Sequence, residues 1–184
     1  GNGTFDMDVS FSDGETVEIK GYDTRNGTPA YVYSDQFLDI NTYPNTYSLR
    51  NLNDSTAYIG FTNLSQGASQ QEEIASFIRS IAGKPNLIID VRNNGGGNLT
   101  NATRMAQRFT NEKVLTGYIQ HKTGKGHSDF SDPTPIYVEP SNSIRWQKKV
   151  IVLTNRHSYS ATNDFVNSMR CFPNVTLIGD KTGG

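Results

Sequence analysis

From residue 56 onward, short apolar runs alternate with segments in which apolar residues have helix-like spacing. The runs at residues 56–62, 87–91, 150–153 and 175–178 have the length of buried strands. Between the first two, apolar side chains recur at i, i+3, i+4 and i+7: Ile74, Phe77, Ile78 and Ile81. This spacing predicts an amphipathic helix, which Gly83 and Pro85 end. Strand, helix and strand at this length predict a βαβ unit with parallel pairing, and hence an α/β fold.

Further patterns refine the helices. Ser69 and Glu72 have the spacing of a capping box at the start of the first helix. A second amphipathic helix is predicted from Leu99, Ala102, Met105, Ala106 and Phe109. A third follows the run at 150–153, where apolar residues recur at a spacing of four: Ala161, Phe165 and Met169.

The N-terminal part has a different pattern. Apolar and polar residues alternate on either side of the turn-forming segment 12–14, so residues 1–22 predict a β-hairpin. A lone hairpin is marginal in water, and we expect it to be the remnant of a preceding domain. Residues 23–54 are rich in Tyr, Asn, Asp and Thr and predict a connector with one short strand near Ala30 to Tyr33. Residues 55–184 form the expected core domain.

A long exposed loop is expected over residues 121–147, after a strand near 114–120. It contains one short strand at 136–138, and Trp146 is expected to anchor its return to the core. We interpret His121 and His127 as solvated loop residues, because no Cys, Asp or Glu completes a metal-ligand spacing with them. No metal and no cofactor are therefore expected.

Composition narrows the functional classes. The chain has 17 basic and 18 acidic residues, so its charge gives no reason to expect a nucleic-acid partner. A single cysteine, Cys171, allows no internal disulfide. No apolar run reaches the length of a transmembrane segment, and the first residues lack the regions of a signal peptide.

The candidate chemistry centres on Ser160. It lies where an apolar strand ends and the third helix begins, so unpaired backbone N–H groups of that helix could stabilise an oxyanion beside it. The alternative is structural: Ser158 or Ser160 is the helix N-cap, and Asp164 complements the first turn. A glycine-rich turn at 95–97 follows another strand and would let backbone N–H groups approach a ligand closely.

Together these segments resemble the serine peptidases of the C-terminal processing protease and tricorn core family, peptidase family S41. The family's Asp-Leu-Arg-x-Asn-x-Gly-Gly, Ser-Ala-Ser-Ala and Gly-Glu-x-Thr-x-Gly patterns are matched in order. The matching residues are Asp90, Arg92, Asn94, Gly96 and Gly97, then Ser158, Ser160 and Ala161, then Gly179, Thr182 and Gly184.

The resemblance implies a crotonase-like or ClpP-like α/β core in a tricorn-like or bacterial extracytoplasmic peptidase that cleaves polypeptides. It implies Ser160 as the nucleophile, with an oxyanion hole from Ala161 and from Gly96 or Gly97. The family's base is a lysine just past Gly184 or a histidine ahead of the core, so we expect a fragment, truncated at its C-terminus and inactive alone. Within the chain, His157 and Lys181 are the candidate bases.

The sequence leaves three questions open. A PDZ domain commonly precedes the core in this family, but 22 residues are too few for a whole one. The competing function is a non-catalytic module that binds a peptide or a lipophile on the same fold. The oligomeric state is left open.

Overall fold

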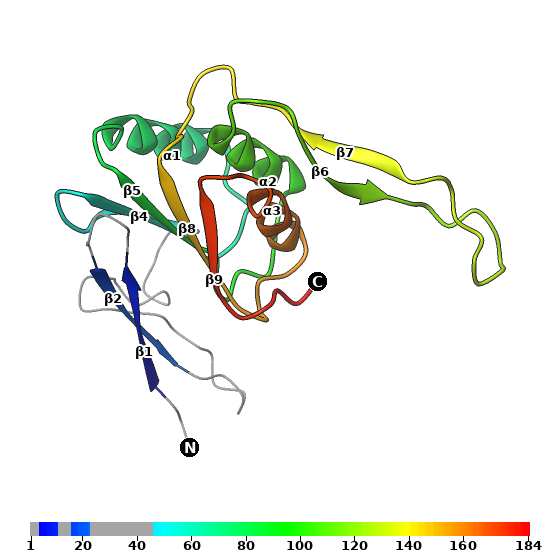
Figure 1. Cartoon of the computed structure of the whole chain (residues 1–184), viewed down its shortest axis with the longest axis horizontal. Coiled ribbons are helices and arrows are strands. Elements are labelled where there is room, and N and C mark those ends of the chain that lie inside the picture. The colour runs from blue at the N-terminus through cyan, green and yellow to red at the C-terminus, as the bar shows by residue number, and fades with distance from the viewer. Residues whose placement is uncertain (1–3, 11–15, 23–45) are drawn as a thin grey trace.

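The computed structural model describes residues 4–10, 16–22 and 46–184. Its main sheet has 5 strands in the order β3-β4-β5-β8-β9 (Figure 1). They are β3 (Tyr47–Asn51), β4 (Thr56–Phe61), β5 (Asn86–Asp90), β8 (Lys149–Thr154) and β9 (Val175–Gly179). Strand β3 pairs antiparallel with β4, and the other neighbours pair in parallel. The expected α/β fold with a mainly parallel sheet is therefore confirmed.

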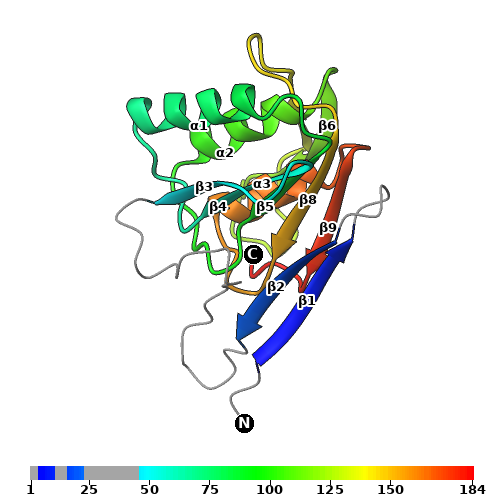
Figure 2. The same cartoon turned by 90° about the vertical axis from the view of Figure 1, so that its left-hand side faces the viewer.

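Three helices pack on one face of this sheet (Figures 1 and 2). They are α1 (Ala68–Ser80), α2 (Leu99–Ala106), which a 3₁₀ turn extends as η2 (Gln107–Phe109), and α3 (Ala161–Met169). All three contribute side chains to one core cluster with alternate residues of the strands, such as Ile59 and Ile89. The intervening residues Ile88 and Leu153 point to the opposite face and are also buried. Burial on both faces explains why the strands are continuous apolar runs.

Two helix predictions need correction. The N-cap of α1 is Gly67, whose N–H donates to Gln70 Oε1 at 3.0 Å, so the capping box at Ser69 and Glu72 was wrong. The helix begins earlier than expected because the amide of Gln70 supplies the reciprocal bond that a glutamate usually makes. Leu99 is 55% exposed although it was placed on the apolar stripe of α2. It lies in the first helical turn, beyond the edge of the core.

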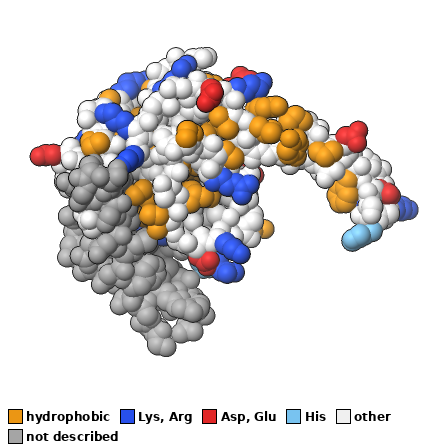
Figure 3. Space-filling model, viewed as in Figure 1, with side chains coloured by type: hydrophobic (Ala, Val, Ile, Leu, Met, Phe, Trp, Pro, Cys, Tyr) orange, Lys and Arg blue, Asp and Glu red, His pale blue; other side chains and the backbone are white. Residues whose placement is uncertain are grey.

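The strands expected near 114–120 and at 136–138 are both present, and their pairing means that residues 121–147 do not form one long loop. Strand β6 (Val114–Ile119) pairs antiparallel with β7 (Thr134–Val138), and the two form a ribbon that projects from the body (Figure 1). Hydrophobic side chains gather along this ribbon (Figure 3), including Tyr118, which is 62% exposed. Trp146 is 3% exposed and its backbone N–H donates to Arg108 O at 2.6 Å, so its expected anchoring role is confirmed.

The N-terminal hairpin is confirmed: β1 (Thr4–Ser10) pairs antiparallel with β2 (Thr16–Tyr22). Strand β3 lies within the range expected to be a connector, so the main sheet begins at Tyr47. The strand expected near Ala30 to Tyr33 lies outside the described residues, and the division into domains stays a prediction. None of the described helices is long and apolar enough to cross a membrane.

Candidate active site

Three loops meet at one edge of the main sheet. They follow β5, β8 and β9, which are neighbours and parallel, so their carboxyl ends lie together. The Tyr159 N–H donates to Asn94 O at 3.0 Å, and the Ser160 N–H donates to Gly184 O at 2.7 Å. The Gly183 N–H donates to Ser158 O at 2.9 Å. The three sequence patterns are therefore joined by backbone hydrogen bonds.

Ser160 is exposed and occupies the N-cap position of α3. Its backbone has φ 55 and ψ −128, a region that favours glycine, and its hydroxyl makes no capping bond. Such a conformation costs a non-glycine residue about 1–3 kcal/mol. The N-cap interpretation therefore describes the position of Ser160, but the hydroxyl does not perform a cap's function. Asp164 lies in the first turn of α3, as expected.

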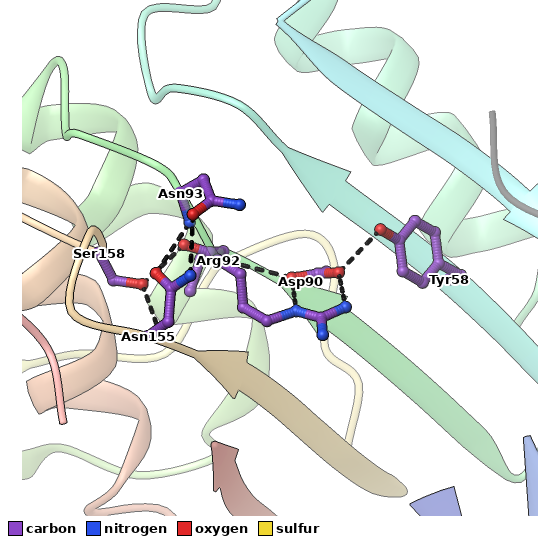
Figure 4. Close-up of polar contacts among 7 residues, drawn as sticks. Tyr58, Asp90, Arg92, Asn93, Asn155 and Ser158 are labelled. Atoms are coloured by element: carbon purple, nitrogen blue, oxygen red, sulfur yellow. Dashed lines mark hydrogen bonds and ion pairs between the residues drawn. The ribbon is translucent and has the colours of Figure 1, made fainter. Parts of the chain in front are cut away.

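Ser158 is fully buried and connects two of the loops (Figure 4). Its hydroxyl donates to Val91 O at 2.8 Å and accepts from the Asn155 N–H at 3.2 Å. The Asn155 amide extends the connection: Nδ2 donates to Asn93 Oδ1 at 2.8 Å, and Oδ1 accepts from the Asn93 N–H at 3.0 Å. Ser158 and Asn155 thus hold the loop after β8 against the loop after β5.

The glycine turn passes directly beside Ser160. Gly96 has φ 111, and a Cβ on it would lie 2.8 Å from Ser160 Cβ and 3.2 Å from Ala161 N. Gly97 has φ 144, and a Cβ on it would lie 2.7 Å from the backbone carbon of Leu64. Neither position accepts a side chain without rearrangement of its neighbours.

The backbone N–H groups near Ser160 differ in what they bind. The Gly96 N–H donates to Asn94 Oδ1 at 3.0 Å. In the described part of the chain, the N–H groups of Gly97 and Ala161 make no hydrogen bond. The Ala161 N–H belongs to the first turn of α3, where the helix dipole is positive. Two unbonded donors therefore lie on the segments that flank Ser160.

Asn94 received no individual role from the sequence, although it lies inside the recognised pattern. Its side chain is fully buried, and Oδ1 accepts from Thr162 Oγ1 at 2.6 Å as well as from the Gly96 N–H. Its Nδ2 donates to Phe61 O at 3.1 Å. The amide thereby ties the glycine turn to the first turn of α3. Nothing in the sequence around Thr162 indicated that it would be the partner.

Asp90 and Arg92 form a buried ion pair at the end of β5 (Figure 4). Arg92 Nη2 and Nε donate to the two carboxylate oxygens at 2.6 and 2.9 Å, and Tyr58 OH donates to Oδ2 at 3.1 Å. The Arg92 N–H donates to Asp90 Oδ1 at 3.0 Å. This pair orients the backbone at the end of β5.

Neither candidate base hydrogen-bonds to Ser160. His157 is exposed, and its backbone N–H donates to Asn155 Oδ1 at 3.1 Å. Lys181 is exposed, and its backbone N–H donates to Asp180 Oδ1 at 2.7 Å. This bond, followed by the ion pair with Arg156, lowers the pKa of Asp180 below its usual value. Among the described residues, none makes a hydrogen bond to the Ser160 hydroxyl.

Comparison with family models matches residues 55–184 to Peptidase family S41. The chain therefore belongs to this family, and the resemblance of its three patterns is confirmed. This is a family of peptidases. Comparison with curated proteins gave no match.

Solved structures agree with this assignment. A crystal structure of a protein assigned as a peptidase from Parabacteroides merdae is 46% identical, with a TM-score of 0.71. The match covers 76% of this chain and 44% of that chain, so the present chain spans less than half of its relative. The fold is shared with the photosystem II D1 C-terminal processing protease, at 16% identity and TM-score 0.60 over 94% of this chain and 45% of that one. It is also shared with mature CPAF complexed with lactacystin, at 13% identity and TM-score 0.64 over 100% and 55%.

Proposed function

We propose that Ser160 is the nucleophile of a serine endopeptidase whose core this chain forms. The observation that carries the proposal is the exposed hydroxyl at the N-terminus of α3, on a residue held at φ 55. Strain of this kind persists only where the surroundings enforce it, and it is typical of functional positions. A nucleophilic serine on a sharp turn between a strand and a helix is a recurrent arrangement in hydrolases.

The reaction would proceed through an acyl-enzyme. Ser160 Oγ attacks the carbonyl carbon of a peptide bond while a base accepts the hydroxyl proton. The C–N bond then breaks, the base returns the proton to the leaving amine, and water hydrolyses the ester by the same steps in reverse. The substrate is a polypeptide, in keeping with the family.

The oxyanion that forms needs two aligned donors. We assign them to the N–H groups of Ala161 and Gly97, because neither makes another bond within the described residues. The Gly96 N–H is already bonded to Asn94, so Gly96 serves a different purpose. Its missing side chain permits the close approach of the turn to Ser160.

The base is proposed to come from residues outside the present sequence. The hydroxyl of Ser160 has no bond to His157 or Lys181, and the other histidines, His121 and His127, lie beyond the end of β6 on the projecting ribbon. We further propose, from the family resemblance alone, that the protein acts outside the cytoplasm.

The decisive experiment compares Ser160→Ala and Ser160→Gly with the wild type in the full-length protein. Peptide hydrolysis should fall by roughly 10⁴-fold or more in both variants. Ser160→Gly should melt at a higher temperature than Ser160→Ala, because glycine adopts φ 55 without strain. Folded variants that retain wild-type hydrolysis would remove the proposal and favour a non-catalytic binding module on this fold.

A further inference from the structure

A second feature lies at the other end of β8 from Ser160. A cavity of about 460 Å³ opens between α1, η2 and the segment 139–144, which leads into that strand. Three arginines line it: Arg79, Arg104 and Arg108. None of the lining residues belongs to the candidate active site. Its volume falls in the range of small-molecule sites.

Arg108 is the central observation. The residue is 5% exposed, and Nη1 donates to Met105 Sδ at 3.3 Å. No other hydrogen bond or ion pair of its side chain occurs among the described residues, and a thioether is a weak acceptor. Burial and the nearby charge of Arg104 lower the pKa of Arg108 to about 10, so it remains a cation at neutral pH. The carboxylate of Glu72 acts on Arg108 at a distance, but it is already paired with Arg79. A buried cation without a bonded counter-ion is costly unless a bound anion supplies one.

The other charges around the cavity are already paired. Arg79 Nη1 lies 2.8 Å from Glu72 Oε1. Glu139, on the opposite wall, lies 2.9 Å from Lys113 Nζ. Within the described residues, Arg104 and Arg108 enter no ion pair. Two positive charges therefore remain available on the wall formed by α2 and η2.

The amide of Gln71, a neutral group on α1, also lacks a hydrogen-bond donor in the described part of the chain. Gln71 is 7% exposed and lines the cavity, and its Oε1 accepts no hydrogen bond from any described residue. A buried acceptor without a donor is uncommon and calls for a partner. Oε1 is enclosed, so a ligand hydroxyl reaches it only if the Gln71 side chain turns toward the cavity. A ligand that satisfies both walls would carry an anion toward the arginines and a hydroxyl toward Gln71.

We propose that this cavity binds a small phosphomonoester that also carries a hydroxyl group. Near neutral pH such a phosphate is close to a dianion, which matches two unpaired arginines, and guanidinium groups bind its oxygens in a bidentate manner. The proposal is independent of the role of Ser160, because the two sites share no residue.

Calorimetric titration with glycerol 3-phosphate tests the proposal, with glycerol and sodium acetate at equal ionic strength as comparison ligands. Saturable binding is expected for glycerol 3-phosphate alone. Arg108→Gln should weaken it at least about 10-fold. The control Arg170→Gln, an exposed arginine at the end of α3, should bind like the wild type.

Thermal melting supplies the second readout. The phosphomonoester should raise the melting temperature of the wild type and of Arg170→Gln, but not that of Arg108→Gln. Should Arg108→Gln fail to fold, Arg104→Gln replaces it, since Arg104 is exposed and its loss removes no buried packing. The proposal is overturned if the wild type shows no saturable binding, if acetate binds as tightly, or if the arginine variants bind unchanged.

Discussion

Thr162 Oγ1 donates a 2.6 Å hydrogen bond to Asn94 Oδ1, and both side chains are fully buried. The same oxygen accepts the Gly96 N–H at 3.0 Å. A single carbonyl oxygen thus fixes the distance between the glycine turn and the helix that begins after Ser160. In the proposed mechanism this distance sets the separation between the two oxyanion donors, the N–H groups of Gly97 and Ala161.

Asn94→Ala should therefore impair both folding and catalysis. It leaves the Gly96 N–H and the Thr162 hydroxyl without their acceptor in the interior, which costs about 1–3 kcal/mol for each group. Because Asn94 acts through the donors, kcat should fall more than KM rises, by roughly 10- to 1000-fold if the donors separate. Urea unfolding and peptide hydrolysis in the full-length protein measure the two effects.

A double-mutant cycle with Thr162→Val isolates the Asn94–Thr162 bond. We expect a coupling free energy of about 1 kcal/mol or more between the two substitutions, because they share a direct contact. Strictly additive losses of unfolding free energy would show that the hydroxyl and the amide act separately.

The glycine turn allows a comparison within three consecutive residues. Gly96→Val should abolish activity and destabilise the fold, because its Cβ would lie 2.8 Å from Ser160 Cβ at φ 111. Gly97→Val should do the same through contact with Leu64 and the displaced N–H. Gly95→Ala is the matched control, since a Cβ there has no neighbour within 4 Å.

Hydrolysis and thermal unfolding must be measured together for these variants. The oxyanion role predicts a loss of roughly 100-fold or more in kcat for variants that remain folded at the assay temperature. Folded Gly96→Val and Gly97→Val proteins with the activity of Gly95→Ala would rule out a role for this turn in catalysis.

Much of the fold could be predicted from the sequence because the regular spacing of apolar residues determines which side chains are buried. Ile74, Ile78 and Ile81 recur on one side of α1, and all three are buried against the sheet. Strand β3 escaped prediction because Tyr47 and Ser48 are consecutive buried residues without the alternation of a strand. Its position depends on pairing with β4, which is a non-local interaction. The strands β6 and β7 were each expected from the sequence, but their antiparallel pairing into a ribbon was not, because it too is a non-local interaction.

The sequence likewise identified only part of the candidate site. The glycine turn and the Ser160 segment carry contiguous patterns, so the sequence could name their residues. The link between Asn94 and Thr162 joins residues 68 apart, and it exists only because β5 and β8 are neighbours in the sheet. The base was not identified, because neither His157 nor Lys181 is placed by a local pattern.

Tyr47 predicts a specific alkaline behaviour. Its hydroxyl donates a hydrogen bond to Glu73 Oε2 on α1, and burial, with this bond second, raises the pKa of Tyr47 to about 12. The folded state thus favours the neutral phenol relative to the unfolded state, whose pKa is near 10. The stabilisation is complete below pH 10 and is lost as pH rises toward 12.

The difference in unfolding free energy between wild type and Tyr47→Phe isolates this group. It should be constant at neutral pH and shrink between pH 10 and 12. Tyr118→Phe, which removes a tyrosine hydroxyl from the exposed ribbon, should show no such change. A pH-independent difference for Tyr47→Phe would contradict the raised pKa.

The last prediction concerns the base, and it rests on what surrounds the Ser160 hydroxyl. A general base within hydrogen-bond reach contributes roughly 10²- to 10⁴-fold to the rate, and no described residue bonds to this hydroxyl. A fluorophosphonate, which reacts with activated serines, should therefore label the 184-residue chain slowly and the full-length protein rapidly. Ser160→Ala should abolish labelling in both, which identifies the site. Rapid stoichiometric labelling of the 184-residue chain would instead place the base within it, and His157→Gln and Lys181→Met would then decide between the two candidates, because only the loss of the true base slows the reaction.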